Sequence, residues 1–338
     1  MKIFRGYQHR ELAQPCALTI GNFDGVHRGH QAMLALLKNE ARHRGLPACV
    51  MTFEPHPREY FTPAHAPARI STLRDKLTEL ARCGIDQTVV LPFNAGLASQ
   101  SADAFISDVL VKGLRARYVL VGDDFRFGSK RSGDYAMLDA AGDAAGFDVA
   151  RMNSYEVHGT RVSSSAVRQA LAQGDMDESA RLLGRPYSIS GHVIHGKKLG
   201  RTLGFRTLNV AFRHTHPAAS GIFAVRTHGL GAASDAPLDG VASLGVRPTV
   251  EDAGRVLLEV HCFDWPSALA ASPQAPRGLD SAYGKIVRVE LLHKLHDELK
   301  YDGLEALTQG IARDCVNARA FLASMHTETS RQTTRDRI

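Results

Sequence analysis

A glycine-rich run near the start of the chain, GNFDGVHRGH at residues 21–30, has the residue types needed to hold phosphates and react with them. Its glycines let the backbone approach phosphate oxygens, and a helix beginning at Gly29 would point free backbone amides at an anion. His27 and His30 are three residues apart, so at a helix start both imidazoles would face the same ligand. There they could stabilise the charge that develops when pyrophosphate leaves a nucleotide. The run therefore predicts nucleotide chemistry.

Two other interpretations of the histidine pair exist. Histidines at a tight turn can simply cap a helix, and an isolated HxxH spacing is often no more than that. Here the pair follows a β-rich segment, lies in a glycine-rich loop and precedes a helical pattern, which favours the phosphate-binding interpretation. A zinc site is disfavoured because the run has no HExxH pattern and no third nearby ligand.

A second glycine-rich run, GHVIHGKKLGRTLGFRTLNV at residues 191–210, lies in the other half of the chain. Glycines there often mark only β-turns, but glycines mixed with clustered cations suit a phosphate-binding loop better. The residues with this predicted role are Gly196, Lys197, Lys198, Gly200 and Arg201. Just beyond, Thr207 and Asn209 would share one strand face, as ligation of a magnesium–nucleotide complex requires. The same alternation is common on plain solvent-facing strands.

Glu259 is the single carboxylate of an apolar segment, LLEVHCF at residues 257–263. A carboxylate in such a strand could act as the base that deprotonates a substrate hydroxyl. A salt-bridged glutamate on an edge strand would give the same pattern, so the residues alone leave both interpretations open.

Alternating elements would hold the first run in place. From residue 16 to about 152, β-rich runs alternate with helical patterns, which predicts a parallel sheet covered by helices on both faces. The expected strands are residues 17–20, 48–53, 88–91, 118–121 and 147–152, and the expected helices are residues 29–44, 71–83, 101–113 and 133–145. Ligands of such folds bind beyond the carboxyl ends of the strands. Polar clusters fall at those ends, at residues 21–24, 54–57 and 122–124, so this edge is the predicted site.

The second half has a different pattern, in which strands follow one another without intervening helices. After two short helices within residues 163–184, strands are expected near residues 187–194, 221–227, 239–244, 255–263 and 285–292, and a helix at about 302–324. This order predicts an antiparallel barrel or sandwich with a terminal helix. We expect domains of residues 1–185 and 186–325, a surface loop at residues 266–281, and a disordered polar tail at residues 326–338.

Composition limits the class of protein. The chain has 338 residues, enough for two domains, with the 44% hydrophobic and 22% charged residues of an ordinary globular protein. It has no apolar stretch of bilayer length and no signal-peptide core at its start, so we expect a cytoplasmic protein without membrane partners. Five scattered cysteines without a CxxC pair are expected to be free thiols. The net charge of +6 is interspersed with acidic residues, which suits anionic small substrates and favours no nucleic-acid partner.

The histidine run and two further segments resemble a known superfamily. His27-Arg28-Gly29-His30 resembles the HxGH signature of the nucleotidyltransferases, and with TFEPHP at 52–57 and VGDDFRFG at 121–128 it resembles their flavin-adenylylating branch. TRVSSSAVR at 160–168 resembles their second nucleotide motif, although a helix cap would explain its serine run alone. The resemblance implies that His27 and His30 are catalytic. It implies nucleotide binding by Gly21, Asn22, Phe23, Asp24, Gly29, Asp124, Arg161, Ser164, Ser165 and Arg168.

Residues 186–325 resemble the riboflavin kinase domain, and residues 20–325 together resemble the bacterial bifunctional riboflavin kinase/FAD synthetases. The resemblance implies a Rossmann-like first domain and a six-stranded β-barrel in the second. It implies that Thr207 and Asn209 lie at the magnesium–ATP site and that Glu259 is the base for the ribityl 5'-hydroxyl. Two positions depart from the family, because Arg206 replaces the proline of a PTxN motif and His296 replaces a common arginine.

The leading hypothesis is therefore sequential synthesis, in which the second domain phosphorylates riboflavin to FMN and the first transfers AMP from ATP to FMN. Mg²⁺ would accompany ATP, and FMN and FAD would be substrate and product rather than bound redox cofactors. One alternative is a nucleotidyltransferase for another phosphorylated acceptor, without kinase activity. Another is a basic, non-enzymatic module whose binding to nucleic acid or a regulatory partner falls steeply with salt. The sequence predicts no oligomeric state.

Overall fold

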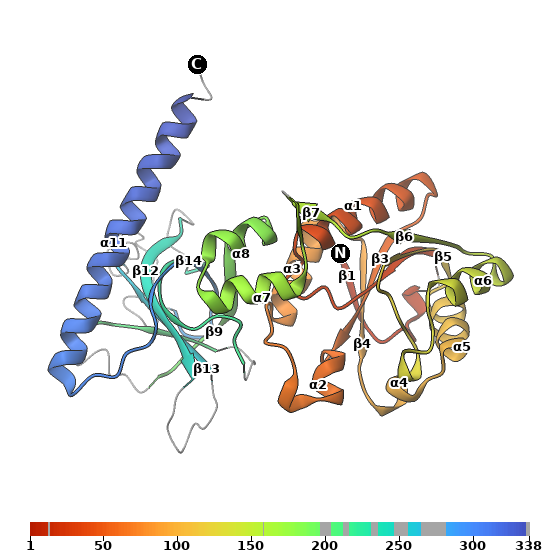
Figure 1. Cartoon of the computed structure of the whole chain (residues 1–338), viewed down its shortest axis with the longest axis horizontal. Coiled ribbons are helices and arrows are strands. Elements are labelled where there is room, and N and C mark those ends of the chain that lie inside the picture. Colours follow the sequence, from red (N-terminus) through yellow and green to blue (C-terminus); the bar gives the residue numbers. More distant parts are fainter. Residues whose placement is uncertain are drawn as a thin grey trace. The chain divides into compact units, whose positions relative to one another are not determined.

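The computed structural model describes residues 1–12, 14–157, 159–196, 204–211, 216–230, 236–246, 256–264 and 282–335. The chain forms two compact units (Figure 1). The first comprises Met1–Pro67 and Leu73–Ala166, and the second Ala68–Thr72 and Val167–Ile338. The expected boundary between independent domains near residue 185 stays a prediction.

A parallel sheet forms the centre of the first unit, with strand order β1-β4-β3-β2-β5-β6. The strands are β1 (Lys2–Arg5), β2 (Cys16–Ile20), β3 (Ala48–Glu54), β4 (Gln87–Pro92), β5 (Ala116–Gly122) and β6 (Asp148–Met152). All five predicted strands are present. Strand β1 escaped prediction because Phe4 is its only buried residue, so the sequence there has no apolar run.

Helices cover both faces of this sheet (Figure 1). They are α1 (Arg28–His43), α2 (Pro57–Phe61), α3 (Leu73–Arg82), α4 (Ala95–Ser99), α5 (Ala102–Ala104), a π-helix (Phe105–Gly113), α6 (Tyr135–Ala145) and 3-10 turns at Arg10–Leu12, Pro63–His65 and Ser129–Arg131. Leu34 of α1 and Leu80 of α3 pack in one core, and Val109 of the π-helix and Leu138 of α6 pack in the other. Apolar side chains on both faces explain the unbroken burial of β2.

Short elements connect the sheet to the second part of the chain. They are the hairpin β7 (Glu156–Val157) and β8 (Thr160–Arg161), followed by α7 (Ser164–Gln173) and α8 (Met176–Leu183). The two helices agree with the two short helices predicted within residues 163–184.

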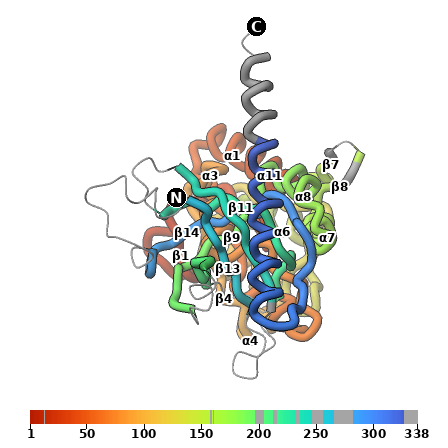
Figure 2. The backbone as a smooth tube through the Cα atoms, turned by 90° about the vertical axis from the view of Figure 1, so that its left-hand side faces the viewer, coloured from red at the N-terminus to blue at the C-terminus, as the bar shows by residue number. Residues whose placement is uncertain are grey.

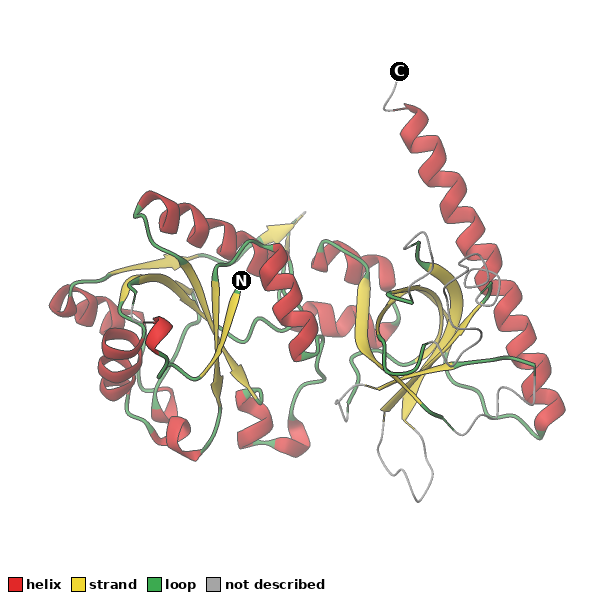
Figure 3. Ribbon diagram, turned by 180° about the vertical axis from the view of Figure 1, so that it is seen from behind, coloured by secondary structure: helices red, strands yellow, loops and turns green. Residues whose placement is uncertain are grey.

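The second unit is a closed six-stranded antiparallel barrel with strand order β10-β13-β12-β11-β14-β9 (Figure 3). The strands are β9 (Tyr187–Ile194), β10 (Leu208–Ala211), β11 (Gly221–His228), β12 (Leu238–Val246), β13 (Val256–Cys262) and β14 (Ile286–His296). Closure pairs β9 with both β10 and β14. The predicted barrel with a terminal helix is therefore confirmed.

Helix α11 (Leu304–Arg335) lies along the outside of the barrel (Figure 2). Its Ala318 and Leu322 are buried against Ala224 and Val241 of the barrel wall. The helix continues past the predicted end at residue 324, because the polar tail up to Arg335 contains neither proline nor glycine to stop it. No helix in the described ranges is long and apolar enough to cross a membrane.

Candidate active sites

The loop between β2 and α1 lies where the strand order of the sheet reverses. Strand β2 pairs with β3 on one side and with β5 on the other, and such a switch point is where open parallel sheets bind ligands. His27 caps α1, because its Nδ1 accepts a hydrogen bond from the backbone N–H of His30 at 3.3 Å. A nitrogen that accepts a hydrogen bond carries no proton, so neutral His27 has its proton on Nε2, as a donor. The capping role and a phosphate-binding role are therefore compatible.

His30 lies against His27 and is held neutral. The two rings stack with centroids 3.6 Å apart, and the ring of Phe23 lies 4.9 Å from that of His30. His30 Nδ1 is fully enclosed and has no hydrogen-bond partner among the described residues. Burial, followed by the charges of His27 and Lys76, holds the pKa of His30 well below its ordinary value. The ring is therefore uncharged at neutral pH.

Close packing in this loop requires its glycines. A Cβ at Gly29 would lie 3.2 Å from His27 Nδ1 and 3.3 Å from the backbone oxygen of Val162. A Cβ at Gly21 would lie 3.1 Å from the ring of Phe23, which is fully buried at a φ of 47°. A positive φ at a phenylalanine is strained, and such strain is typical of a functional turn.

The second nucleotide motif contacts the first through Ser164. Its Oγ donates to the backbone oxygen of Asp24, which is itself buried, at 3.0 Å. The helix cap that the serine run could provide belongs to Ser163, whose Oγ accepts from the amide of Ala166 at 3.2 Å. Ser165 is exposed. The fold thus brings together two segments that are 140 residues apart in the sequence.

Other predicted residues of the first site are exposed or have other contacts. Arg161 forms an ion pair at 3.5 Å with Asp123. The predicted site residue Asp124, next to Asp123 in the sequence, has an exposed side chain. Arg168 Nε donates to the backbone oxygen of Ala68 at 2.7 Å, within the second unit.

A buried lysine near the histidines was not predicted. Lys76 of α3 is 1% exposed, and its Nζ donates to Thr52 Oγ1 at 3.4 Å. The signal in the sequence is its position one helical turn before Leu80, on the apolar face of the helix.

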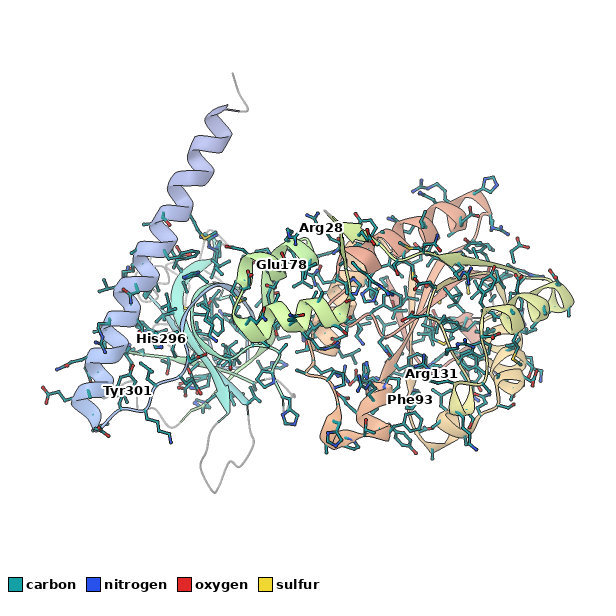
Figure 4. All side chains as sticks on the ribbon, in the orientation of Figure 1. Arg28, Phe93, Arg131, Glu178, His296 and Tyr301 are labelled. Atoms are coloured by element: carbon teal, nitrogen blue, oxygen red, sulfur yellow. The ribbon has the colours of Figure 1, made fainter. Side chains whose placement is uncertain are left out.

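An aromatic cluster beyond the ends of β3 and β4 was also missed. Phe53, Tyr60, Phe61 and Phe93 contact one another edge to face, with centroids 5.3 to 5.8 Å apart. Figure 4 labels Phe93 in this cluster. Phe61 is 61% exposed, so the cluster offers an open apolar surface at the edge where the predicted site lies. Aromatic residues at the ends of two parallel strands were the signal that could have found it.

Three polar residues form a row across the outer face of the barrel. Asn209 of β10 is paired with Glu259 of β13, which in turn is paired with Ser243 of β12. Leu258 and Val260 are buried while Glu259 between them is half-buried, so Glu259 points outward. Strand β13 lies between β10 and β12, so the alternative of an edge-strand glutamate is wrong.

Asn209 is packed in a way that suits a ligand. It is 7% exposed, and its Oδ1 has no hydrogen-bond partner in the described part of the chain. A Cβ at Gly196 would lie only 2.2 Å from Asn209 Nδ2, so the backbone there lies directly against the amide. Thr207 is half-buried and lies just before β10, which begins at Leu208, so the predicted strand face shared with Asn209 is not formed at this residue. An enclosed amide oxygen suits a magnesium ion, which prefers oxygen ligands.

The remaining cations and glycine of the predicted phosphate loop lie outside the described residues. They are Lys197, Lys198, Gly200 and Arg201. The predicted surface loop at residues 266–281 lies outside them as well. At the departure from the PTxN motif, the backbone oxygen of Arg206 accepts a hydrogen bond from His261 Nδ1 at 2.8 Å.

A second carboxylate reaches the row from the segment after β14. Ser243 Oγ donates to Glu298 Oε1 at 3.0 Å, and a Cβ at Gly245 would lie 2.1 Å from the same oxygen. The carboxylate of Glu298 therefore packs against Ser243 and Gly245 of β12, the strand next to the one that carries Glu259. Sequence reasoning gave no signal for this contact, because it depends on the path of the chain after β14.

His296 links the end of β14 to helix α11 (Figure 4). Its Nε2 lies 2.8 Å from Asp314 Oδ1, and its Nδ1 donates to the backbone oxygen of Asp297 at 2.6 Å. Burial by itself would lower the pKa of His296, but the hydrogen bonds to Asp314 and Asp297 outweigh it and raise the pKa. Histidine here thus keeps a cationic contact of the kind arginine would provide.

Two family models match the chain. The FAD synthetase model matches residues 9–166, and the riboflavin kinase model matches residues 183–322. The first match contains the histidine pair, and the second contains the row on the barrel.

Curated relatives match almost the whole chain. Bifunctional riboflavin kinase/FMN adenylyltransferases of Escherichia coli and Haemophilus influenzae are 45% and 42% identical, covering 95% and 96% of this chain and 98% and 100% of the relatives. The enzyme of Pseudomonas fluorescens is 43% identical, covering 96% of this chain and 98% of its own. A crystal structure from Streptococcus pneumoniae, described as a macrolide-efflux protein, shares the fold with a TM-score of 0.72 and 25% identity over 93% of this chain and 97% of that one. The chain belongs to the family of bifunctional riboflavin kinase/FMN adenylyltransferases.

Proposed function

We propose that this chain makes FAD in two steps, with the barrel phosphorylating riboflavin to FMN and the parallel-sheet unit transferring AMP from ATP to FMN. The observation that carries the proposal is the pairing of Asn209 with Glu259, because it sets a candidate nucleotide ligand beside a candidate base within the riboflavin kinase match. The histidine pair at the switch point of the FAD synthetase match supports the second step.

In the kinase step, Glu259 accepts the proton of the ribityl 5'-hydroxyl. The oxygen attacks the γ-phosphorus of ATP, the bond between that phosphorus and the bridging oxygen breaks, and ADP leaves. Because Glu259 points out of the barrel beside Asn209, base and nucleotide would lie on the same outer face. Gly196, Lys197, Lys198, Gly200 and Arg201 are the proposed phosphate-binding residues, on sequence grounds.

Thr207 and Asn209 would hold a Mg²⁺ ion together with ATP. When bound, the ion would neutralise phosphate charge and polarise the γ-phosphoryl group. The enclosed and unpartnered Oδ1 of Asn209, in the described part of the chain, supports this assignment.

In the adenylyl step, a phosphate oxygen of FMN attacks the α-phosphorus of ATP and pyrophosphate takes the electrons of the broken bond. Neutral His27 donates from Nε2 and neutral His30 from its protonated nitrogen, so both imidazoles can stabilise the leaving pyrophosphate. Ser164 holds the second motif against the loop. The other proposed nucleotide contacts are Gly21, Asn22, Phe23, Asp24, Gly29, Asp124, Arg161, Ser165 and Arg168.

The aromatic cluster supports a flavin as the acceptor, because an exposed ring such as Phe61 can pack against the planar isoalloxazine. Riboflavin, FMN and ATP would thus be the small-molecule partners, with no nucleic acid or membrane required. A cytoplasmic location would fit these substrates and the five free cysteines, which stay reduced in that compartment.

The test is to incubate the protein with riboflavin, ATP and Mg²⁺ and to follow FMN and FAD by chromatography. His30→Ala should accumulate FMN without FAD. Glu259→Ala should make no FMN from riboflavin yet convert added FMN to FAD. If the unaltered protein makes neither product, the proposal fails. If both variants lose both reactions equally, the division of roles is wrong.

A further inference from the structure

Lys76 is a buried cation in the first unit that the reaction as described above does not use. It lies on α3 with 1% of its surface exposed, one turn before the core residue Leu80. Burying an ammonium group costs free energy unless the surroundings use its charge, and lysine is seldom fully buried. Its position therefore calls for an explanation beyond packing.

The ammonium group is connected to the nucleotide loop. Lys76 Nζ donates to Thr52 Oγ1 at 3.4 Å, and Thr52 Oγ1 donates to the backbone oxygen of Asn22 at 3.1 Å. Thr52 is fully buried, so water does not compete for these bonds. Helix α3 is thereby joined to the loop between β2 and α1.

Lys76 also acts electrostatically on His30. After burial and His27, Lys76 is the third cause that lowers the pKa of His30. The titratable groups that act on the pKa of His30 are His27 from its own loop and Lys76 from α3, and Asp24, 1% exposed, is the buried acid of that loop. A cation at this place favours a neutral imidazole and also opposes the negative charge of a triphosphate.

We propose that Lys76 is a positioning residue for adenylyl transfer, which fixes the loop at Asn22 through Thr52 and places its ammonium group where it acts on His30. The inference rests on the proposed function. It differs from the roles of the histidines, because Lys76 acts through Thr52 and His30.

The experiment compares Lys76→Met, which keeps the length and removes the charge, with Lys76→Arg, which keeps the charge. FAD formation from added FMN, ATP and Mg²⁺ is measured between pH 5.5 and 9 on the full chain, and FMN formation from riboflavin provides an internal reference. Lys112→Met is the matched control, because Lys112 lies in the same unit with an exposed side chain in a surface ion pair.

For Lys76→Met we expect kcat/KM of FAD formation to fall by about 10²-fold, the loss typical of one preorganised electrostatic group. Without the charge the pKa of His30 rises, so the acid limb of the pH profile should move to higher pH. Lys76→Arg should restore most of the rate and the original limb. FMN formation and the Lys112→Met variant should be unchanged.

An acid limb at its original pH in Lys76→Met, or equal losses in the Met and Arg variants, would overturn the inference. If Lys76→Met does not fold, Thr52→Val tests the other connection, because it breaks the contact to Asn22 and keeps the charge. It should lower FAD formation without moving the acid limb, and an unchanged rate would refute the role. If the wild-type protein makes no FAD from FMN, the proposed function itself is refuted.

Discussion

Gly196→Ala should disable the kinase step by displacing one side chain. The added Cβ would lie 2.2 Å from Asn209 Nδ2 and 2.6 Å from its Cγ. Strands β9 and β10 are paired here, with Ile194 opposite Asn209, so the backbone has little freedom to move away. The amide of Asn209 must therefore shift.

The size of the shift follows from ordinary contact distances. Ordinary Cβ contacts begin at about 3.4 Å, so the amide must move by about 1.2 Å, the difference between 3.4 and 2.2 Å. A misplacement of about 1 Å at a reacting centre can cost ~10²-fold in rate. That corresponds to about 2.7 kcal/mol of lost transition-state stabilisation.

The assay measures initial rates of FMN formation at varied ATP and fixed Mg²⁺, with conversion of added FMN to FAD as the reference in the same samples. We expect kcat/KM for ATP in the kinase step to fall about 10²-fold and FAD formation to be unchanged. Gly96→Ala is the control for a glycine replacement, because its Cβ would meet Asn94 at an ordinary 3.4 Å.

A double-mutant cycle can refute the reasoning. In an Asn209→Ala background the clash has no amide to displace, so Gly196→Ala should add little further loss. If it lowers the kinase rate as much in that background as in the wild type, the effect does not pass through Asn209.

Three further predictions concern contacts that the sequence did not reveal. His296 has a raised pKa, so its pairing with Asp314 stabilises the fold fully below the unfolded pKa, near 6.5, and less as pH rises through the folded value. Asp314→Asn should therefore lower the Tm more at pH 6 than at pH 9, and equal losses would contradict this. Glu298→Gln should lower kcat/KM for riboflavin by about tenfold by weakening the hold on Ser243, with FAD formation from FMN unaffected; a loss of FAD formation as well would argue against it. Phe61→Ala should raise KM for FMN in FAD formation by up to about tenfold through loss of ring contact, and an unchanged KM would exclude Phe61 from flavin binding.

The fold was largely predictable because most of its strands are uniformly apolar or alternate with period two. Strand β2 is buried along its whole length, and β13 alternates between buried and half-buried residues, so both patterns are visible in the sequence. Strand β1 was missed because three of its four residues are exposed. The helix expected at residues 101–113 is present, but no sequence pattern predicted that most of it is π-helical.

The candidate sites were predictable only where their residues lie close together in the sequence. The histidine pair and its glycines occupy ten consecutive residues, so their spacing already defines a constellation. The pairing of Asn209 with Glu259 depends on strand register across a closed barrel, and the contact of Glu298 with Ser243 depends on the path of the chain after β14. Lys76 shows a further limit, because a lysine on a helix is expected at the surface unless the buried face is already known.

Helices α7 and α8 have a practical consequence for separating the two activities. Ser164 at the start of α7 contacts the nucleotide loop, whereas α8 packs against β9 and β14 of the barrel with Leu182 and Leu183 buried. A kinase fragment that begins at residue 186 would leave that part of the barrel bare, and a cut before α7 would take Ser164 from the adenylyl site. The boundary between the two units falls after Ala166, inside α7, so a cut there would divide this helix. We therefore expect fragments that both retain residues 164–183 to be more active than fragments made by a cut inside α7.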